Sequence, residues 1–131
     1  MSYQVGTAHT VRALHVMPGM EGPEGVLHPH RYRLEVVVER ESLDERGMVC
    51  DLDVLEAALR EAAARVEDAD LEAIRPPDVE AVTVEVFARW LHGELAEPVR
   101  VAGGERLTVR VWESDSAFGG YAAAVTPAGP T

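Results

Sequence analysis

The chain has 131 residues and a formal net charge of −11, from 23 acidic and 12 basic residues, and every basic residue is an arginine. This length predicts one domain, or one subunit of an assembly that buries more surface than a monomer could. The acidic charge argues against a nucleic-acid partner, since phosphate contacts need clustered cations, and no window reaches the ~18 apolar residues of a membrane span.

The N-terminal half is predicted to hold two strands and a helix. Residues 2–9 form a strand, followed by a long loop, VMPGMEGPEG, whose glycines and prolines stop regular structure. Residues 30–40 form the strongest strand, because apolar side chains alternate there. After a polar turn, apolar residues at helical spacing predict a helix capped by Asp51, with an apolar side made of Leu52, Leu55, Leu59, Ala62 and Val66.

The C-terminal half is predicted to hold a second helix and two strands. The helix is marked by Val84, Phe87, Leu91 and Leu95, and the segments RLTVRVWES and GGYAAAV alternate as strands. Residues 126–131 are expected to be a disordered tail of a single domain that spans residues 1–131. The order strand, strand, helix, helix, strand, strand predicts an α+β fold, with an antiparallel four-stranded sheet and two helices on one face.

Two histidines, His28 and His30, lie at the start of the strongest strand, in the stretch LHPHRYRLEV. Residues i and i+2 of a strand point to the same face, so this pair can supply two ligands to one zinc ion. His9 reaches the same point if the two strands pair antiparallel, and three histidines leave a fourth position open, as in catalytic zinc sites. The alternative is that these are strand-end histidines without a role. No role is expected for His15, which is predicted to lie in a loop, or for His92, which is predicted to lie on a helix.

The single cysteine, Cys50, excludes an internal disulfide and a multi-cysteine zinc site. Any bound metal must therefore be held by imidazole or carboxylate groups. The first ten residues, MSYQVGTAHT, lack the basic and apolar regions of a signal peptide. We therefore expect a soluble, cytoplasmic protein.

Five segments resemble one family when they are taken in order. The segments are GTAH (6–9), LHPHRYRLEVVV (27–38), GMVCDLDVLEAAL (47–59), TVEVFARWL (83–91) and VRVWES (109–114). They are similar to the successive motifs of the 6-pyruvoyl-tetrahydropterin synthase and 6-carboxytetrahydropterin synthase family. No single segment is specific to this family, but five segments in this order and at suitable spacing are. The resemblance implies the tunnelling fold, in which three subunits join their sheets into a ring-shaped barrel and two such rings stack. We therefore expect self-association to a trimer or hexamer.

The resemblance also implies a site for zinc and a pterin. His9, His28 and His30 correspond to the three zinc ligands, and Glu113 to a carboxylate that anchors the pterin. A carboxylate can pair with two adjacent N–H donors of the pterin, and zinc can polarise the oxygens of the substrate side chain. The implied activity is that of a lyase acting on dihydroneopterin triphosphate or a related pterin. The substrate and the pathway, whether queuosine, folate or biopterin synthesis, stay open.

The sequence departs from the family at its catalytic residues. Glu24 stands where the family's catalytic cysteine lies, four residues before the first histidine of the pair. The family's Asp-His pair after the first helix becomes Glu67 and Asp68. Pro29 replaces the usual glycine between the paired histidines, which removes a backbone donor. Cys50 is no substitute for the cysteine, because it precedes the first helix.

The sequence is compatible with three functions. In the first, the protein is an enzyme whose general base is Glu24, as in family members that carry glutamate near this position and cleave the side chain of dihydroneopterin. In the second, it is a pterin-binding or structural homo-oligomer, with Glu24 in an exposed loop and Glu67 and Asp68 at a solvated helix end. In the third, it binds zinc without a pterin and has no use for Glu113.

Overall fold

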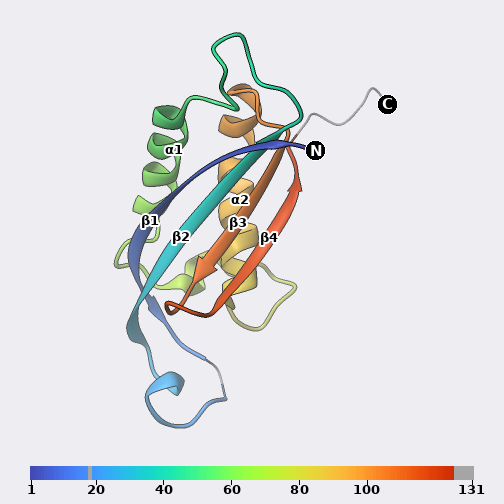
Figure 1. Ribbon diagram of the computed structural model, residues 1–131. Helices are drawn as coiled ribbons and strands as arrows, with labels where there is room; N and C mark the ends of the chain where they lie inside the picture. The colour runs from blue at the N-terminus through green and yellow to red at the C-terminus, as the bar shows by residue number, and fades with distance from the viewer. Residues whose placement is uncertain (18, 126–131) are drawn as a thin grey trace.

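Four strands form one antiparallel sheet in the computed structural model, which describes residues 1–17 and 19–125 (Figure 1). They pair in the order β1-β2-β3-β4. Their bounds are β1 (Tyr3–His15), β2 (His28–Arg40), β3 (Arg106–Trp112) and β4 (Phe118–Ala124). The predicted α+β fold with a four-stranded antiparallel sheet is confirmed. The predicted tail, residues 126–131, lies outside the described residues.

Two helices, α1 (Leu52–Ala64) and α2 (Val84–Val101), cover the same face of the sheet (Figure 1). Asp51 caps α1 as predicted, because its carboxylate accepts a hydrogen bond of 2.9 Å from the backbone N–H of Asp53. Short 3₁₀ helices, η1 (Gly22–Gly25) and η2 (Leu71–Ile74), lie in the connecting segments. Within the described residues, no helix has the length and apolar character needed to cross a membrane.

The core lies between the helices and the face of the sheet that they cover, which we term the inner face. Alternate residues of β2 point inward, and Tyr32, Leu34, Val36 and Val38 are each at most 3% exposed. The helices add buried side chains from their apolar sides, among them Leu55, Leu59, Phe87, Leu91 and Leu95. The same alternation extends to the start of β2 and directs His28 and His30 to the inner face.

Strand β1 runs six residues beyond its predicted end at residue 9. It continues because Val11 and Ala13, 1% and 0% exposed, keep the period of two and pack into the core. His15 is the last residue of this strand. The prediction that His15 lies in a loop was therefore wrong, and His15 is instead paired with His28.

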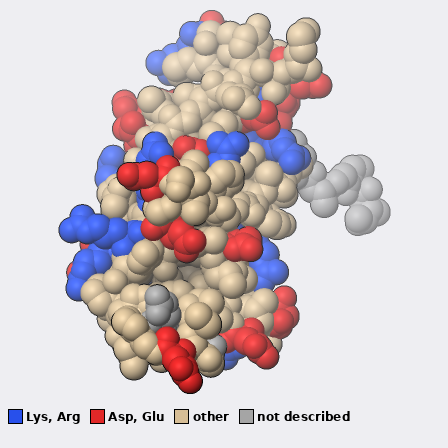
Figure 2. Space-filling model, turned by 60° about the horizontal axis from the view of Figure 1, so that its bottom comes forward, with Lys and Arg blue, Asp and Glu red and all other residues tan. Residues whose placement is uncertain are grey.

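The outer face of the sheet carries ion pairs and has no covering layer in the described chain. Arg110 donates to Glu35 at 2.8 Å, and Arg106 lies 3.7 Å from Glu39. Strands β1 and β4 are the two edges of the sheet. In Figure 2 the molecule is turned so that the end where a loop joins β1 to β2 comes forward. Acidic and basic side chains are interspersed there among a larger number of uncharged ones.

Candidate functional site

Three histidines gather on the inner face at the end of the sheet where β1 ends and β2 begins. His15 is paired directly with His28, and His30 is paired with Ala13, two positions along the ladder. Side chains of directly paired residues share a face, as do those of residues i and i+2. The ring centroids of His15 and His28 are 5.8 Å apart, and those of His28 and His30 are 6.4 Å apart. The fold thus brings His15, His28 and His30 together.

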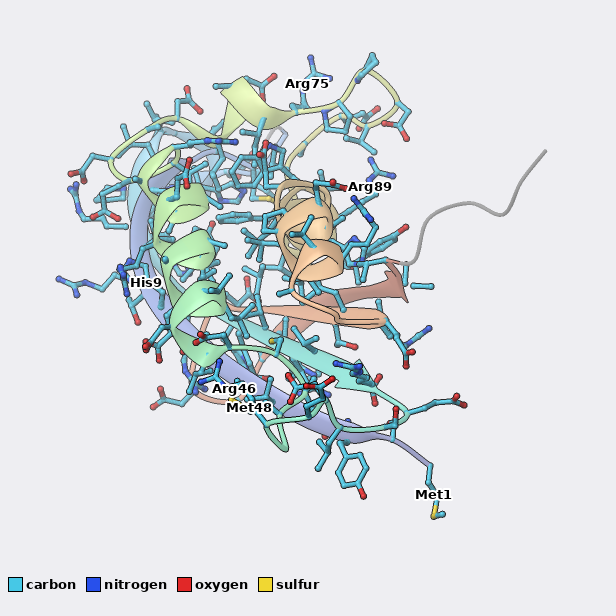
Figure 3. The ribbon with its side chains drawn as sticks, turned by 90° about the horizontal axis from the view of Figure 1, so that it is seen from above. Met1, His9, Arg46, Met48, Arg75 and Arg89 are labelled. Atoms are coloured by element: carbon cyan, nitrogen blue, oxygen red, sulfur yellow. The ribbon has the colours of Figure 1, made fainter. Side chains whose placement is uncertain are left out.

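His9, predicted as the third zinc ligand, lies away from this group. It is paired with Leu34, four positions along the ladder from His30, which is about 13 Å at the usual rise of a strand. Figure 3 shows His9 on β1 beside α1. The sequence prediction assumed that β1 ended near His9, whereas the strand continues to His15. The register therefore does not bring His9 to His28 and His30.

Each of the three histidines bonds one backbone carbonyl through one ring nitrogen. His15 Nε2 lies 3.1 Å from the oxygen of Val82, and His28 Nδ1 lies 2.9 Å from that of Val26. His30 Nε2 lies 3.1 Å from the oxygen of Glu113. Because a carbonyl only accepts, the bonded nitrogen carries a proton, and in the neutral form of each ring the lone pair lies on Nδ1 of His15, Nε2 of His28 and Nδ1 of His30. This is the tautomer set that metal-ligating histidines use.

The environment of His15 favours its neutral form. Burial is the main cause that lowers its pKa from the ordinary value, and the carbonyl of Val82 partly opposes it. Positive charge on His28 or His30 lowers the pKa further, while the carboxylate of Glu113 raises it. A neutral imidazole is the form that binds a metal ion.

The histidines do not yet form a closed metal site. In the part of the chain that the structure describes, no three His, Cys, Asp or Glu side chains are grouped closely enough to hold a metal ion. The chemistry of the donor set nevertheless fits zinc, because three neutral imidazoles with carbonyl-bonded N–H groups can supply three nitrogen ligands. Closing the site would require His15 and His28 to approach His30.

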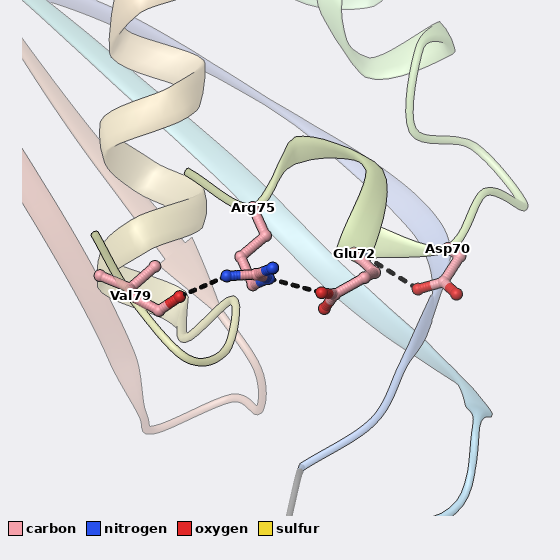
Figure 4. Close-up of polar contacts among 4 residues, drawn as sticks. All are labelled: Asp70, Glu72, Arg75 and Val79. Carbon is pink, nitrogen blue, oxygen red and sulfur yellow. Dashed lines mark hydrogen bonds and ion pairs between the residues drawn. The ribbon is translucent and has the colours of Figure 1, made fainter. Parts of the chain in front are cut away.

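The carbonyl that holds His15 belongs to a segment fixed against β1. The N–H of Leu14 donates to the oxygen of Ala69 at 2.8 Å, next to a β-bridge between Leu14 and Asp70. Figure 4 shows how the chain continues from there: Asp70 caps η2 at the N–H of Glu72, and Arg75 contacts both the Glu72 carboxylate and the oxygen of Val79. These contacts hold the segment that leads to Val82.

Glu113 lies just beyond β3, beside the histidines. Its N–H donates to the oxygen of Ala117 at 3.0 Å, which closes a turn, and its own carbonyl accepts from His30. Its carboxylate also acts on Tyr32, whose pKa is raised to about 12, mainly by burial and secondarily by this charge. Glu113 therefore combines an exposed carboxylate with a backbone that supports a histidine.

A cavity of about 370 Å³ opens next to Glu113. Tyr32 and Glu113 line it together with Trp112, Arg31 and Arg33, whose side chains belong to the outer face. Thr10 lines it as well and is also on the outer face, so the cavity opens mainly on the outer face of the sheet, beside Glu113. An aromatic ring and a carboxylate in one cavity are suited to a planar ligand with N–H donors.

The structure does not bring Glu67 and Asp68 to the histidines within one chain. Glu67 Oε2 accepts from the N–H of Arg12 at 3.1 Å, and Asp68 forms an ion pair with the Arg12 guanidinium. Arg12 points to the outer face, opposite to the histidines. Asp68 also has a positive φ of 56°, which places it in a tight turn after α1. Both carboxylates are thus engaged at the edge of β1.

Glu24, the predicted general base, lies in η1 between β1 and β2. Its backbone belongs to the loop that joins His15 to His28, while its side chain is outside the part of the chain that the structure describes.

Cys50 precedes α1, beyond the opposite end of β2, and burial is the main cause that raises the pKa of its thiol. His92, expected to be a helix residue without a role, is buried in α2, with Nε2 3.3 Å from the oxygen of Ala123.

Comparison with known proteins identifies similar folds and one family. The family model for 6-pyruvoyl tetrahydropterin synthase matches residues 4–124. Among solved structures, 6-pyruvoyl tetrahydropterin synthase of Plasmodium falciparum is 13% identical with a TM-score of 0.74, over 94% of this chain and 98% of that one. The Caenorhabditis elegans synthase is 17% identical with a TM-score of 0.65, over 94% and 96%.

A third similar structure is the Plasmodium vivax synthase, in a variant whose catalytic glutamate is replaced by cysteine. It is 12% identical with a TM-score of 0.75, over 95% of this chain and 99% of that one. A search of curated proteins finds no significant match. At these identities the structural likeness establishes the fold alone, while the family model covers most of the chain.

Proposed function

Because the chain belongs to the 6-pyruvoyl tetrahydropterin synthase family, we propose that it is a zinc-dependent lyase acting on a dihydroneopterin-type pterin. The observation that carries the proposal is the arrangement at the end of the sheet: three carbonyl-bonded imidazoles on one face, with the Glu113 carboxylate beside them. The donor set suits zinc, and the carboxylate suits the N–H edge of a pterin.

In this proposal His15, His28 and His30 would hold the zinc ion, with His15 in place of His9. Zinc would supply Lewis-acid polarisation of the substrate's side-chain oxygens. Glu113 would accept hydrogen bonds from the pterin amino group and ring nitrogen, and so orient the substrate with its side chain toward the histidines. The hydrogen bond from His30 to the Glu113 carbonyl supports this placement, because it keeps the two groups adjacent.

Glu24 would serve as the general base that removes a proton from the substrate side chain. Its place in the loop between His15 and His28 supports this role, as does the catalytic glutamate of the Plasmodium vivax synthase. A carboxylate becomes an effective base near neutral pH when burial raises its pKa. Glu67 and Asp68 have no part in this proposal, because Arg12 engages both.

Self-association to a trimer or hexamer completes the proposal. β1 and β4 are both sheet edges, and the outer face is uncovered. Unpaired edge strands are satisfied when another copy of the chain adds its sheet.

The experiment is turnover of dihydroneopterin and of its triphosphate by the wild type, Glu24→Gln and Glu21→Gln. Glu21 is a matched control, because it is an exposed glutamate of the same loop. We expect Glu24→Gln to bind the pterin yet react roughly 10²–10⁴-fold more slowly, the contribution typical of a general base, and Glu21→Gln to react at the wild-type rate. Equal rates for all three proteins would remove Glu24 from the mechanism.

A second candidate is a pterin-binding homo-oligomer without catalysis. The engagement of Asp68 by Arg12, where the family has a catalytic histidine, favours it. In that case the wild type binds pterin and turns over neither substrate. A zinc protein unrelated to pterins would instead bind the metal with equal affinity whether or not pterin is present, and would bind no pterin at all.

A further inference from the structure

The side chain of Tyr32 connects the histidine group to the hydrophobic core. It is 3% exposed and follows His30 by two residues on the inner face of β2. Its ring centroid lies 4.7 Å from that of His30 and 6.5 Å from that of His15, with interplanar angles of 66° and 86°. Both are edge-to-face contacts, the arrangement that aromatic pairs prefer. One ring therefore touches two of the three imidazoles.

Tyr32 is also in contact with α2. The ring of Phe87, 1% exposed, lies 5.3 Å from the Tyr32 ring at an interplanar angle of 73°. These contacts leave Tyr32 little freedom to rotate in a closely packed interior. The hydrophobic core therefore helps to set the position of Tyr32.

A histidine held only by a carbonyl hydrogen bond is not fully oriented. The bond from His30 Nε2 to the Glu113 oxygen fixes one ring atom, but the ring plane can still turn, because χ2 of histidine has broad minima. The edge contact with Tyr32 restricts that plane. The two contacts together determine the direction of the lone pair on Nδ1, which a metal ligand must aim to within a few tenths of an ångström.

We propose that Tyr32 is a positioning residue that holds the ring plane of His30, and with it the Nε2 hydrogen bond to Glu113 that sets the tautomer, for metal binding. The part of this inference that concerns the metal rests on the proposed function, whereas the orientation of His30 in the metal-free protein does not. The phenol hydroxyl is not needed for this role, since the contacts are made by the ring. Tyr32→Phe should therefore behave as the wild type, and Tyr32→Leu should not.

The first measurement uses the metal-free chain. Nitrogen-15 NMR of the histidine rings reports which nitrogen carries the proton. We expect one tautomer at His30, protonated on Nε2, in the wild type and in Tyr32→Phe, and a mixture of tautomers in Tyr32→Leu. Leu107→Ala is the control, because Leu107 is fully buried on the inner face of β3 and is paired with Val38, far from the histidines. It should lose stability and keep the single tautomer.

The second measurement is zinc affinity, determined by competition with a chromophoric chelator. Tyr32→Leu should bind zinc roughly 10- to 100-fold more weakly, the loss typical of removing a group that orients a ligand. Tyr32→Phe and Leu107→Ala should match the wild type. If Tyr32→Leu does not fold, Phe87→Leu replaces it and should shift both measurements in the same direction, because it removes the contact behind Tyr32.

The outcomes separate the two proposals. A wild type that binds no zinc, with the single tautomer of His30 lost in Tyr32→Leu and kept in Tyr32→Phe, would overturn the zinc site and support the role of Tyr32. A wild type that binds zinc, with Tyr32→Leu or Phe87→Leu equal to it in affinity and tautomer, would overturn the role of Tyr32 and leave the zinc site intact.

Discussion

Replacement of Glu113 by glutamine separates pterin binding from zinc binding. The Glu113 side chain is exposed beside the cavity at the end of the sheet, so an amide of nearly the same size can be accommodated. The support that Glu113 gives to His30 comes from its backbone carbonyl, which the substitution leaves in place. The variant should therefore lose the anchor and keep the histidine site.

The magnitude follows from the hydrogen bonds that the amide cannot make. A carboxylate accepts two N–H groups in parallel, whereas glutamine opposes one of them with its own NH₂ group. The loss of one charge-assisted bond, with a donor left unpaired, costs about 2–4 kcal/mol, or roughly a 30- to 1000-fold weaker binding constant. The zinc content should be unchanged.

The assay is a titration of pterin fluorescence with wild type, Glu113→Gln and Asp115→Asn. Asp115 is the control because it is a second exposed carboxylate lining the same cavity. Its substitution should change the binding constant by less than about threefold, as for a screened surface charge. Glu113→Gln binding pterin as tightly as the wild type would refute the assignment of the anchor.

Three further predictions concern stability and assembly. Tyr32 keeps its proton in the folded chain to about pH 12, whereas an unfolded tyrosine ionises near pH 10, so the free energy of unfolding should fall as the pH rises between these values. Denaturant titrations should show a larger loss in the wild type than in Tyr32→Phe, in which the buried Cys50 thiol still contributes. Leu34→Ala should lower the free energy of unfolding by about 2–5 kcal/mol, because Leu34 is fully buried, while Leu27→Ala, at a half-exposed residue, should change it by less than about 1 kcal/mol. Sedimentation should find a trimer or hexamer at micromolar concentration, and a stable monomer would contradict the proposed assembly.

The fold could be predicted from the sequence because most of its signals are local. The alternation in residues 30–40 and the spacing from Leu55 to Ala62 each bury one side, and both segments appear in the structure as β2 and α1. Leu52 was wrongly predicted to share the apolar side of α1, because it lies at the first position of the helix and is 38% exposed. Asp51 was recognisable as a cap by its residue type and position. The continuation of α2 to Val101 was harder to predict, because Pro98 would usually end a helix.

Prediction of the candidate site required knowledge of how the strands pair, which is not a local property of the sequence. His28 and His30 were found because they lie two residues apart on one strand. Which histidine of β1 lies near His28 and His30 depended on where β1 ended. The predicted end was six residues too early, so His9 was expected at this position and His15 lies there instead. The alternation of Val11, Ala13 and His15 was a signal that could have extended the strand. The carbonyls of Val82 and Glu113 were not predictable, since backbone partners far along the chain leave no mark in residue types.

Zinc content of three proteins tests the composition of the site most directly. Wild type, His15→Ala and His9→Ala would be purified in parallel and measured by elemental analysis. His9 is a close control, because it is a partly buried histidine on the same strand and the same face as His15. We predict about one zinc ion per chain in the wild type and in His9→Ala, and almost none in His15→Ala, because two remaining imidazoles hold the ion poorly. Loss of zinc in His9→Ala with retention in His15→Ala, or a wild type without zinc, would contradict the account.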